Sequence, residues 1–158
     1  MSRVPEPRRP RIAYTDGMSA QPPANSPSPA YGVGDASFQA AGGEEGIARL
    51  VDDFYDAMNR LPVAAGIRAL HPVDLSVSRD KLACFLCGWL NGPKRYQEKY
   101  GSISIPGVHA HLAVDTAARD AWLACMVEAL DRQPFADDFK RYLFRQLSVP
   151  AERVRNRD

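Results

Sequence analysis

Apolar residues recur with the 3.6-residue period of an α-helix along most of the chain, and no segment of useful length alternates with the two-residue period of a β-strand. The clearest stripe comprises Ile47, Leu50, Val51, Phe54, Tyr55 and Met58. Comparable stripes predict further long helices over residues 76–90, from Asp115 onward, and over residues 135–147. The sequence therefore predicts an all-α fold with four principal helices.

Local signals predict where several of these helices begin and end. Asp115 and Thr116 are both favourable N-caps for the third long helix. Pro150 is expected to stop the fourth helix, because proline lacks the N–H that a helix interior needs. Pro72 restricts His71, so a short helical turn should end at this pair.

The first 33 residues differ in composition from the rest of the chain. Seven of them are proline, with Ser, Ala and Gly between and no hydrophobic period. Such a segment cannot bury enough apolar area to offset its ordering entropy, so residues 1–33 are predicted to be disordered. The sequence predicts one folded domain over residues 37–149 and a flexible C-terminal end over residues 150–158.

Charge and composition argue against several classes of function. The 158 residues carry 20 basic and 19 acidic side chains, mixed along the chain, which gives no basic footprint for nucleic acid. No apolar run approaches the roughly 20 residues that cross a bilayer. Three cysteines do not make a disulfide framework, which favours a reducing, cytoplasmic compartment. The pair Cys84 and Cys87 lies within a predicted helix and is interpreted as structural.

A histidine and a tryptophan are the most informative polar pair. His109 follows a connection broken by glycine and proline, and Trp122 comes 13 residues later on the third helix. This pair suits a haem pocket, in which an imidazole nitrogen binds iron and an N–H donor faces a ligand on the other side. Counting back from Trp122 without a gap selects His109 as the ligand, whereas a shift of two residues would select His111.

Several motifs together resemble one family. They are Gly42-Gly43, Phe54-Tyr55, His71-Pro72, the Phe85-Leu86-x-x-Trp89 helix, Gly92-Pro93, His109, and the run Arg119-Asp120-Ala121-Trp122-Leu123-x-Cys125-Met126. In this order the motifs are similar to those of the group II truncated haemoglobins, over about residues 37–149. The resemblance implies a two-over-two helical sandwich that encloses haem b (iron protoporphyrin IX).

The same resemblance implies roles for individual residues. His109 would be the proximal iron ligand, and Tyr55, His71, Ser78 and Trp122 would surround the distal ligand. The residues expected to contact the cofactor are His109, Lys81, Tyr96, Leu82, Phe85, Trp122 and Met126. His71 stands where other members have tyrosine or phenylalanine.

Each of these residues also has a purely structural interpretation. The Tyr55 hydroxyl would donate either to a bound diatomic ligand or to a backbone carbonyl, since a buried phenol needs a partner. Trp122 would serve as core packing, as a donor, or as both. His71 would supply a third donor. Lys81 would pair with a haem propionate or simply be solvated, and Ser78 would leave room beside the ligand or belong to a helix start.

The resemblance implies a protein that binds oxygen and acts in oxygen, nitric oxide or peroxide chemistry. One alternative is a haem peroxidase or nitric-oxide dioxygenase that needs a partner reductase, because the chain has no flavin or nicotinamide motif. A second alternative is a haem-free sensor with a globin fold. The expected assembly is a monomer or a homodimer.

Overall fold

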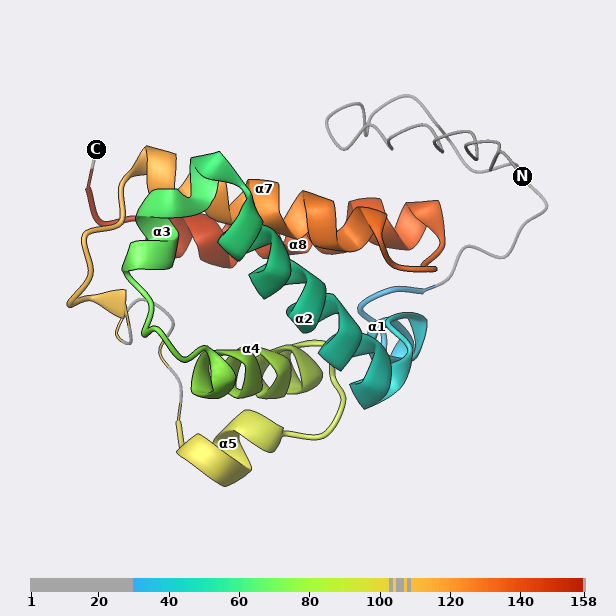
Figure 1. Ribbon diagram of the computed structural model, residues 1–158. Helices are drawn as coiled ribbons and strands as arrows, with labels where there is room; N and C mark the ends of the chain where they lie inside the picture. The colour runs from blue at the N-terminus through green and yellow to red at the C-terminus, as the bar shows by residue number, and fades with distance from the viewer. Residues whose placement is uncertain (1–29, 103, 105–106, 108, 158) are drawn as a thin grey trace, which may run out of the picture.

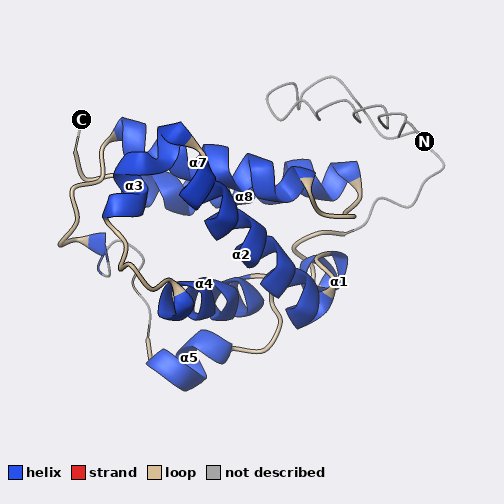
Figure 2. Ribbon diagram, viewed as in Figure 1, coloured by secondary structure: helices blue, strands red, loops and turns tan. Residues whose placement is uncertain are grey.

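The computed structural model describes residues 30–102, 104, 107 and 109–157, and within these residues it contains helices and no strand (Figure 2). The all-α prediction is confirmed. The helices are α1 (Ala36–Ala40), α2 (Gly43–Arg60), α3 (Ala65–Ala69), α4 (Ser76–Trp89), α5 (Arg95–Tyr100), α7 (Thr116–Asp131) and α8 (Asp137–Val154), with a 3-10 turn at Pro62–Ala64.

Four long helices form two layers. In Figure 1, α7 and α8 run side by side, α4 lies on the opposite side of the molecule with α5 beside it, and α2 crosses obliquely between them. Helix α2 packs against both α7 and α4, and α7 packs against α8. This arrangement of α2 and α4 against α7 and α8 is the two-over-two sandwich expected from the resemblance.

Helix α2 forms the centre of the core. All six residues of its predicted stripe are buried, and Phe54 is fully buried. Glu44 and Glu45 in the first turn and Arg60 in the last turn complement the helix dipole. Near its start the helix touches the preceding chain so closely that a Cβ on Gly46 would lie 1.8 Å from the carbonyl oxygen of Ala41. The start of α2 therefore depends on a residue without a side chain.

The N-terminus of α7 is capped as the sequence predicts. Asp115 lies just outside the helix in an extended conformation, and its carboxylate accepts a hydrogen bond of 2.8 Å from the Ala118 N–H. This bond satisfies one of the backbone donors that a helix start leaves without a partner. It also fixes where the face that carries Trp122 begins.

Helix α8 continues through Pro150 to Val154, so the prediction that Pro150 stops it is wrong. The residues that follow are attached to the chain before α7. The Asn156 side chain donates to the Leu112 carbonyl at 2.8 Å, and its oxygen accepts from the Val114 N–H at 2.9 Å. These long-range bonds offset the hydrogen bond that proline removes from the helix. The end of the chain that was expected to be flexible is thereby hydrogen-bonded to the fold as far as Arg157, whose N–H donates to Val114.

The packed structure begins earlier than the sequence predicts. Residues 1–29 of the segment predicted to be disordered lie outside the described residues, but Tyr31 packs against α8. Its ring centroid lies 5.1 Å from those of Phe139 and Tyr142, and its hydroxyl donates to Asp138 at 2.9 Å. These aromatic contacts bury apolar surface of Tyr31, which the composition of the segment did not indicate.

Candidate functional site

A cavity of about 360 Å³ lies between the two helical layers. Its size falls in the range of small-molecule and cofactor sites. The residues predicted for the site that line it are Tyr55, His71, Ser78, Lys81, Leu82, Phe85, Tyr96, His109 and Trp122. They come from α2, α4, α5, α7 and two connecting segments. The fold therefore brings together in one cavity residues that are far apart in the chain.

Met126 is the one predicted site residue that does not line this cavity. It is fully buried in the core, one turn beyond Trp122 on α7. The helical period explains the difference, because a residue four positions further along lies on a similar face but deeper in the molecule. Met126 therefore supports the helix that presents Trp122.

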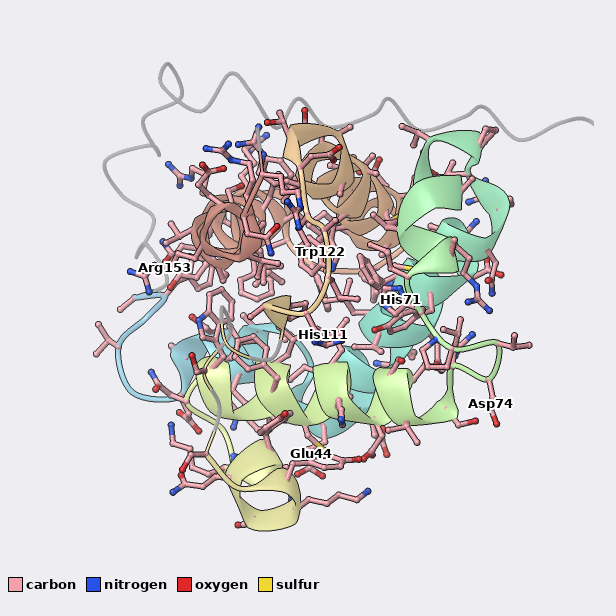
Figure 3. All side chains as sticks on the ribbon, turned by 90° about the vertical axis from the view of Figure 1, so that its left-hand side faces the viewer. Glu44, His71, Asp74, His111, Trp122 and Arg153 are labelled. Atoms are coloured by element: carbon pink, nitrogen blue, oxygen red, sulfur yellow. The ribbon has the colours of Figure 1, made fainter. Side chains whose placement is uncertain are left out.

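His109 lines the cavity and His111 does not. His109 is half-buried, and its carbonyl accepts a hydrogen bond of 2.9 Å from the Leu112 N–H, which closes a turn around it. His111 lies on the connecting chain that crosses the front of the view in Figure 3, and its side chain is exposed. Of the two histidines that the sequence left as candidates, the structure places the side chain of His109 in the cavity wall.

The Tyr55 phenol is buried and already has a hydrogen-bond acceptor. Only 5% of the residue is exposed, and its hydroxyl donates to the backbone carbonyl of Ser78 at 3.3 Å. Burial raises the pKa of the phenol to about 12, although the positive charge of Arg79 opposes that shift. The phenol therefore keeps its proton at neutral pH and donates it in a hydrogen bond to a backbone carbonyl of α4, which was the structural alternative for this residue.

The His71 imidazole also uses its donor within the protein. Its Nδ1 lies 2.7 Å from the carbonyl oxygen of Ile67. A carbonyl only accepts, so Nδ1 carries the proton and Nε2 of the neutral ring has a lone pair. Burial lowers the pKa of His71, and the charges of Arg68 and His109 lower it further, while the Ile67 carbonyl opposes the shift. At neutral pH the ring thus offers an acceptor, which is the opposite of the donor role suggested by the sequence.

Trp122 brings a hydrogen-bond donor, its indole N–H, to the cavity wall. The half-buried indole lines the cavity, and its ring centroid lies 5.0 Å from that of Phe54 on α2. Among the residues that the structure describes, none accepts a hydrogen bond from the indole N–H. Figure 3 labels Trp122 and His71 on different elements, and both residues line the cavity. No residue that the structure describes therefore competes with a ligand for the indole N–H.

Part of the cavity wall comes from residues that the sequence did not predict for the site. Arg119 lines it one helical turn before Trp122, and its guanidinium pairs with Glu152 and, at 3.0 Å, with Asp120. Its spacing of three residues from Trp122 was a signal that could have identified it. Leu147, Pro150, Ala151 and Val154 of α8 complete this side. Three of these four were missed because the helix was expected to end before them.

The thiols and the surface add two further observations. Cys84, Cys87 and Cys125 are free thiols, and burial raises the pKa of Cys87 and of Cys125 to about 11. Such thiols stay protonated and behave as small apolar side chains. In the described part of the chain, no helix combines the length and the apolar character that crossing a membrane requires.

Comparison with known proteins identifies the family. The model of the bacterial-like globin family matches residues 36–152. The group 2 truncated haemoglobin YjbI of Bacillus subtilis (strain 168) is 30% identical over 122 residues, which cover 77% of this chain and 89% of that protein.

Solved structures agree with this assignment. The group II two-on-two haemoglobin of Agrobacterium tumefaciens superposes with a TM-score of 0.74 at 33% identity, covering 77% of this chain and 95% of that one. The cold-adapted truncated haemoglobin of Pseudoalteromonas haloplanktis TAC125 superposes with a TM-score of 0.75 at 28% identity, covering 77% and 98%. The cavity between the two helical layers thus occurs in a chain that belongs to the bacterial-like globins, as a group II truncated haemoglobin.

Proposed function

We propose that the chain binds haem b without a covalent bond in the cavity, with His109 as the iron ligand, and that it retains oxygen there. The observation that carries the proposal is the presence, in one cavity, of the His109 imidazole and of an indole N–H that no described residue uses. Family membership implies haem binding in general, which favours this function over a haem-free sensor.

The residues of the cavity fit this cofactor. Leu82, Phe85, Leu112 and Val114 supply apolar walls for the macrocycle, as cofactor pockets do. Two cations also lie in the wall. The Lys81 side chain is exposed, and the Arg119 guanidinium is fixed in place by two carboxylates. Both cations can donate hydrogen bonds to the propionate groups of a haem in the cavity.

Haem would supply an iron atom that binds a diatomic ligand, and His109 would hold that iron. The protein then acts through the groups around that ligand. Trp122 would donate its N–H to that ligand, and a hydrogen bond to a charged or polarised acceptor contributes about 1.5–3 kcal/mol. Tyr55 would form part of the wall beside the ligand while it donates to the Ser78 carbonyl. A haemoglobin of Bacillus subtilis with a TM-score of 0.70 and 30% identity is described as oxygen-avid, which supports retention of oxygen in this chain.

Chemistry with peroxide or nitric oxide is the second candidate function, and His71 favours the peroxide branch. A neutral imidazole with a lone pair on Nε2 can accept a proton from hydrogen peroxide, as a general base does. Turnover would require an external electron donor, and a nitric-oxide dioxygenase would require a partner reductase. We place this activity in the cytoplasm, in keeping with the three free thiols.

A pair of histidine variants tests the proposed function. His109→Ala should lose haem or take up added imidazole, whereas the matched control His111→Ala should keep the wild-type haem content and absorption spectrum. The measurement is haem stoichiometry together with ferric and ferrous spectra. The reverse pattern would assign the iron ligand to His111. If both variants kept the wild-type haem content and spectrum, neither histidine would be the ligand and the cofactor would bind elsewhere.

A further inference from the structure

Two tyrosines connect the cavity with the surface. Tyr96 of α5 lines the cavity, and Tyr100 lies one helical turn further along the same helix. Their ring centroids are 5.1 Å apart and their planes are inclined by 45°. This spacing is that of aromatic rings in direct contact. The pair therefore forms a continuous aromatic path that starts at the cavity wall and ends at a half-exposed phenol.

The outer phenol has a defined proton acceptor. The Tyr100 hydroxyl donates a hydrogen bond to Oδ2 of Asp80 on α4. The same carboxylate oxygen accepts from Lys99 Nζ at 2.7 Å. Asp80 and Lys99 also line an open surface groove of about 490 Å³. A small molecule in this groove would reach the carboxylate that holds the Tyr100 proton.

We propose that Tyr96 and Tyr100 carry electrons from this groove to the cavity, and that Tyr100 is the site at which an external phenol is oxidised when hydrogen peroxide is reduced in the cavity. This inference rests on the proposed binding of haem. It assigns to the peroxide branch of that function a substrate class, a small phenol, and a second site outside the cavity. It requires no contact between the phenol and the cofactor.

The charges around Tyr100 determine how its electron leaves. Lys81 Nζ and Lys99 Nζ lie 5.3 and 5.7 Å from its ring centroid. Two nearby ammonium groups oppose a positively charged ring, so the phenolic proton must leave together with the electron. One-electron oxidation makes a phenol strongly acidic, and Asp80 can therefore accept its proton even though the Lys99 hydrogen bond lowers the pKa of that carboxyl. The proton returns when the phenol is restored.

The electrons and atoms of the proposed reaction balance. One hydrogen peroxide takes up two electrons and two protons and yields two waters. Two molecules of phenol each lose one electron and one proton and become phenoxyl radicals. Each electron passes from the external phenol to oxidised Tyr100, which had itself given an electron through Tyr96 to the cavity. Nothing besides peroxide and phenol is consumed.

Radical mapping tests the proposal on the haem-loaded full chain. The protein is mixed with hydrogen peroxide and a nitroso spin trap, and the labelled residues are located by peptide mass spectrometry. We expect the adduct on Tyr100 and its loss in Tyr100→Phe. Asp80→Asn should lower the labelling of Tyr100 about tenfold, since it removes a charge-assisted acceptor. Tyr96→Phe should lower it as well.

Two controls separate this route from general oxidation. Tyr142→Phe removes a phenol that packs on Tyr31 and Phe139, and Asp137→Asn changes an exposed carboxylate in the first turn of α8, away from the groove. Both variants should keep full labelling of Tyr100 and the wild-type rate of phenol oxidation.

In the cofactor-free protein, Asp80→Asn should also return the raised pKa of Tyr100 towards its ordinary value of 10.0, measured by ultraviolet titration.

The outcomes distinguish this inference from the proposed function. A protein with a normal haem spectrum whose adducts form on Tyr55 or Trp122 and not on Tyr100 overturns the route and leaves the proposed function standing. An unchanged rate of phenol oxidation in Tyr100→Phe also overturns the route and leaves the proposed function standing. A protein that takes up no haem overturns both.

Discussion

The Tyr55 hydroxyl donates to the carbonyl oxygen of Ser78 at 3.3 Å, across the interface between α2 and α4. This bond uses the proton that a distal tyrosine would otherwise offer to a ligand. His71 uses its Nδ1 proton on Ile67 in the same way. Of the three donors expected around the ligand, Trp122 is the one whose N–H no described residue engages. The retention of a ligand should therefore depend mainly on the indole.

Replacement of Trp122 by phenylalanine tests that dependence. Phenylalanine keeps most of the ring packing against Phe54 but removes the N–H. Oxygen dissociation, measured by stopped flow, should become faster by about tenfold or more, given roughly 1.5 kcal/mol for a charge-assisted hydrogen bond. An off-rate within about twofold of wild type would show that the indole serves only as packing.

Tyr55→Phe should have a smaller effect on the same rate. The hydroxyl is directed at Ser78, so its removal takes little from the ligand, and we expect a change of no more than about threefold. Stability should fall by about 1 kcal/mol, because the fold loses one hydrogen bond. Stopped-flow and urea denaturation measurements on one preparation give both values. A tenfold faster release would mean that the phenol turns towards the ligand.

Stability should fall in mild acid because of His71. Burial chiefly lowers its pKa below 6.5, so between that value and the lower folded-state pKa the unfolded chain binds more protons than the folded one. The contribution of the neutral ring is complete above about pH 6.5 and is lost as the pH falls through the folded-state pKa. His71→Gln should flatten the dependence of the unfolding free energy on pH between 7 and 5, measured by urea denaturation. An equally steep dependence in the variant would contradict this origin.

Two glycine substitutions should have opposite effects. A Cβ on Gly46 would lie 1.8 Å from the Ala41 carbonyl oxygen, so Gly46→Ala must displace backbone and should cost about 3 kcal/mol or more. Gly66 in α3 has no atom within 4 Å of such a Cβ, so Gly66→Ala should stabilise the protein by about 0.5–1 kcal/mol. Thermal and urea unfolding measure both. If both variants had equal stability, the close approach at Gly46 would not constrain the fold.

Much of the fold follows from local pattern. The stripe from Ile47 to Met58 predicted α2 within the bounds that the structure has, and Asp115 capped α7 as its type and position indicated. Helical period and capping are properties of neighbouring residues, so the sequence expresses them directly. The same is true of the inward position of Tyr55 and Trp122, which lie on apolar stripes.

Tertiary structure decided what local pattern does not contain. Pro150 predicts a helix end by its own chemistry, yet α8 continues to Val154, and beyond that end Asn156 bonds to Leu112 and Val114, more than 40 positions away in the chain. The roles of the distal donors were decided in the same way. Residue type states that Tyr55 has a proton to donate, but only the approach of α4 to α2 determines that Ser78 receives it. A side chain's direction is a local property, whereas its hydrogen-bond partner depends on which distant backbone the fold brings within reach.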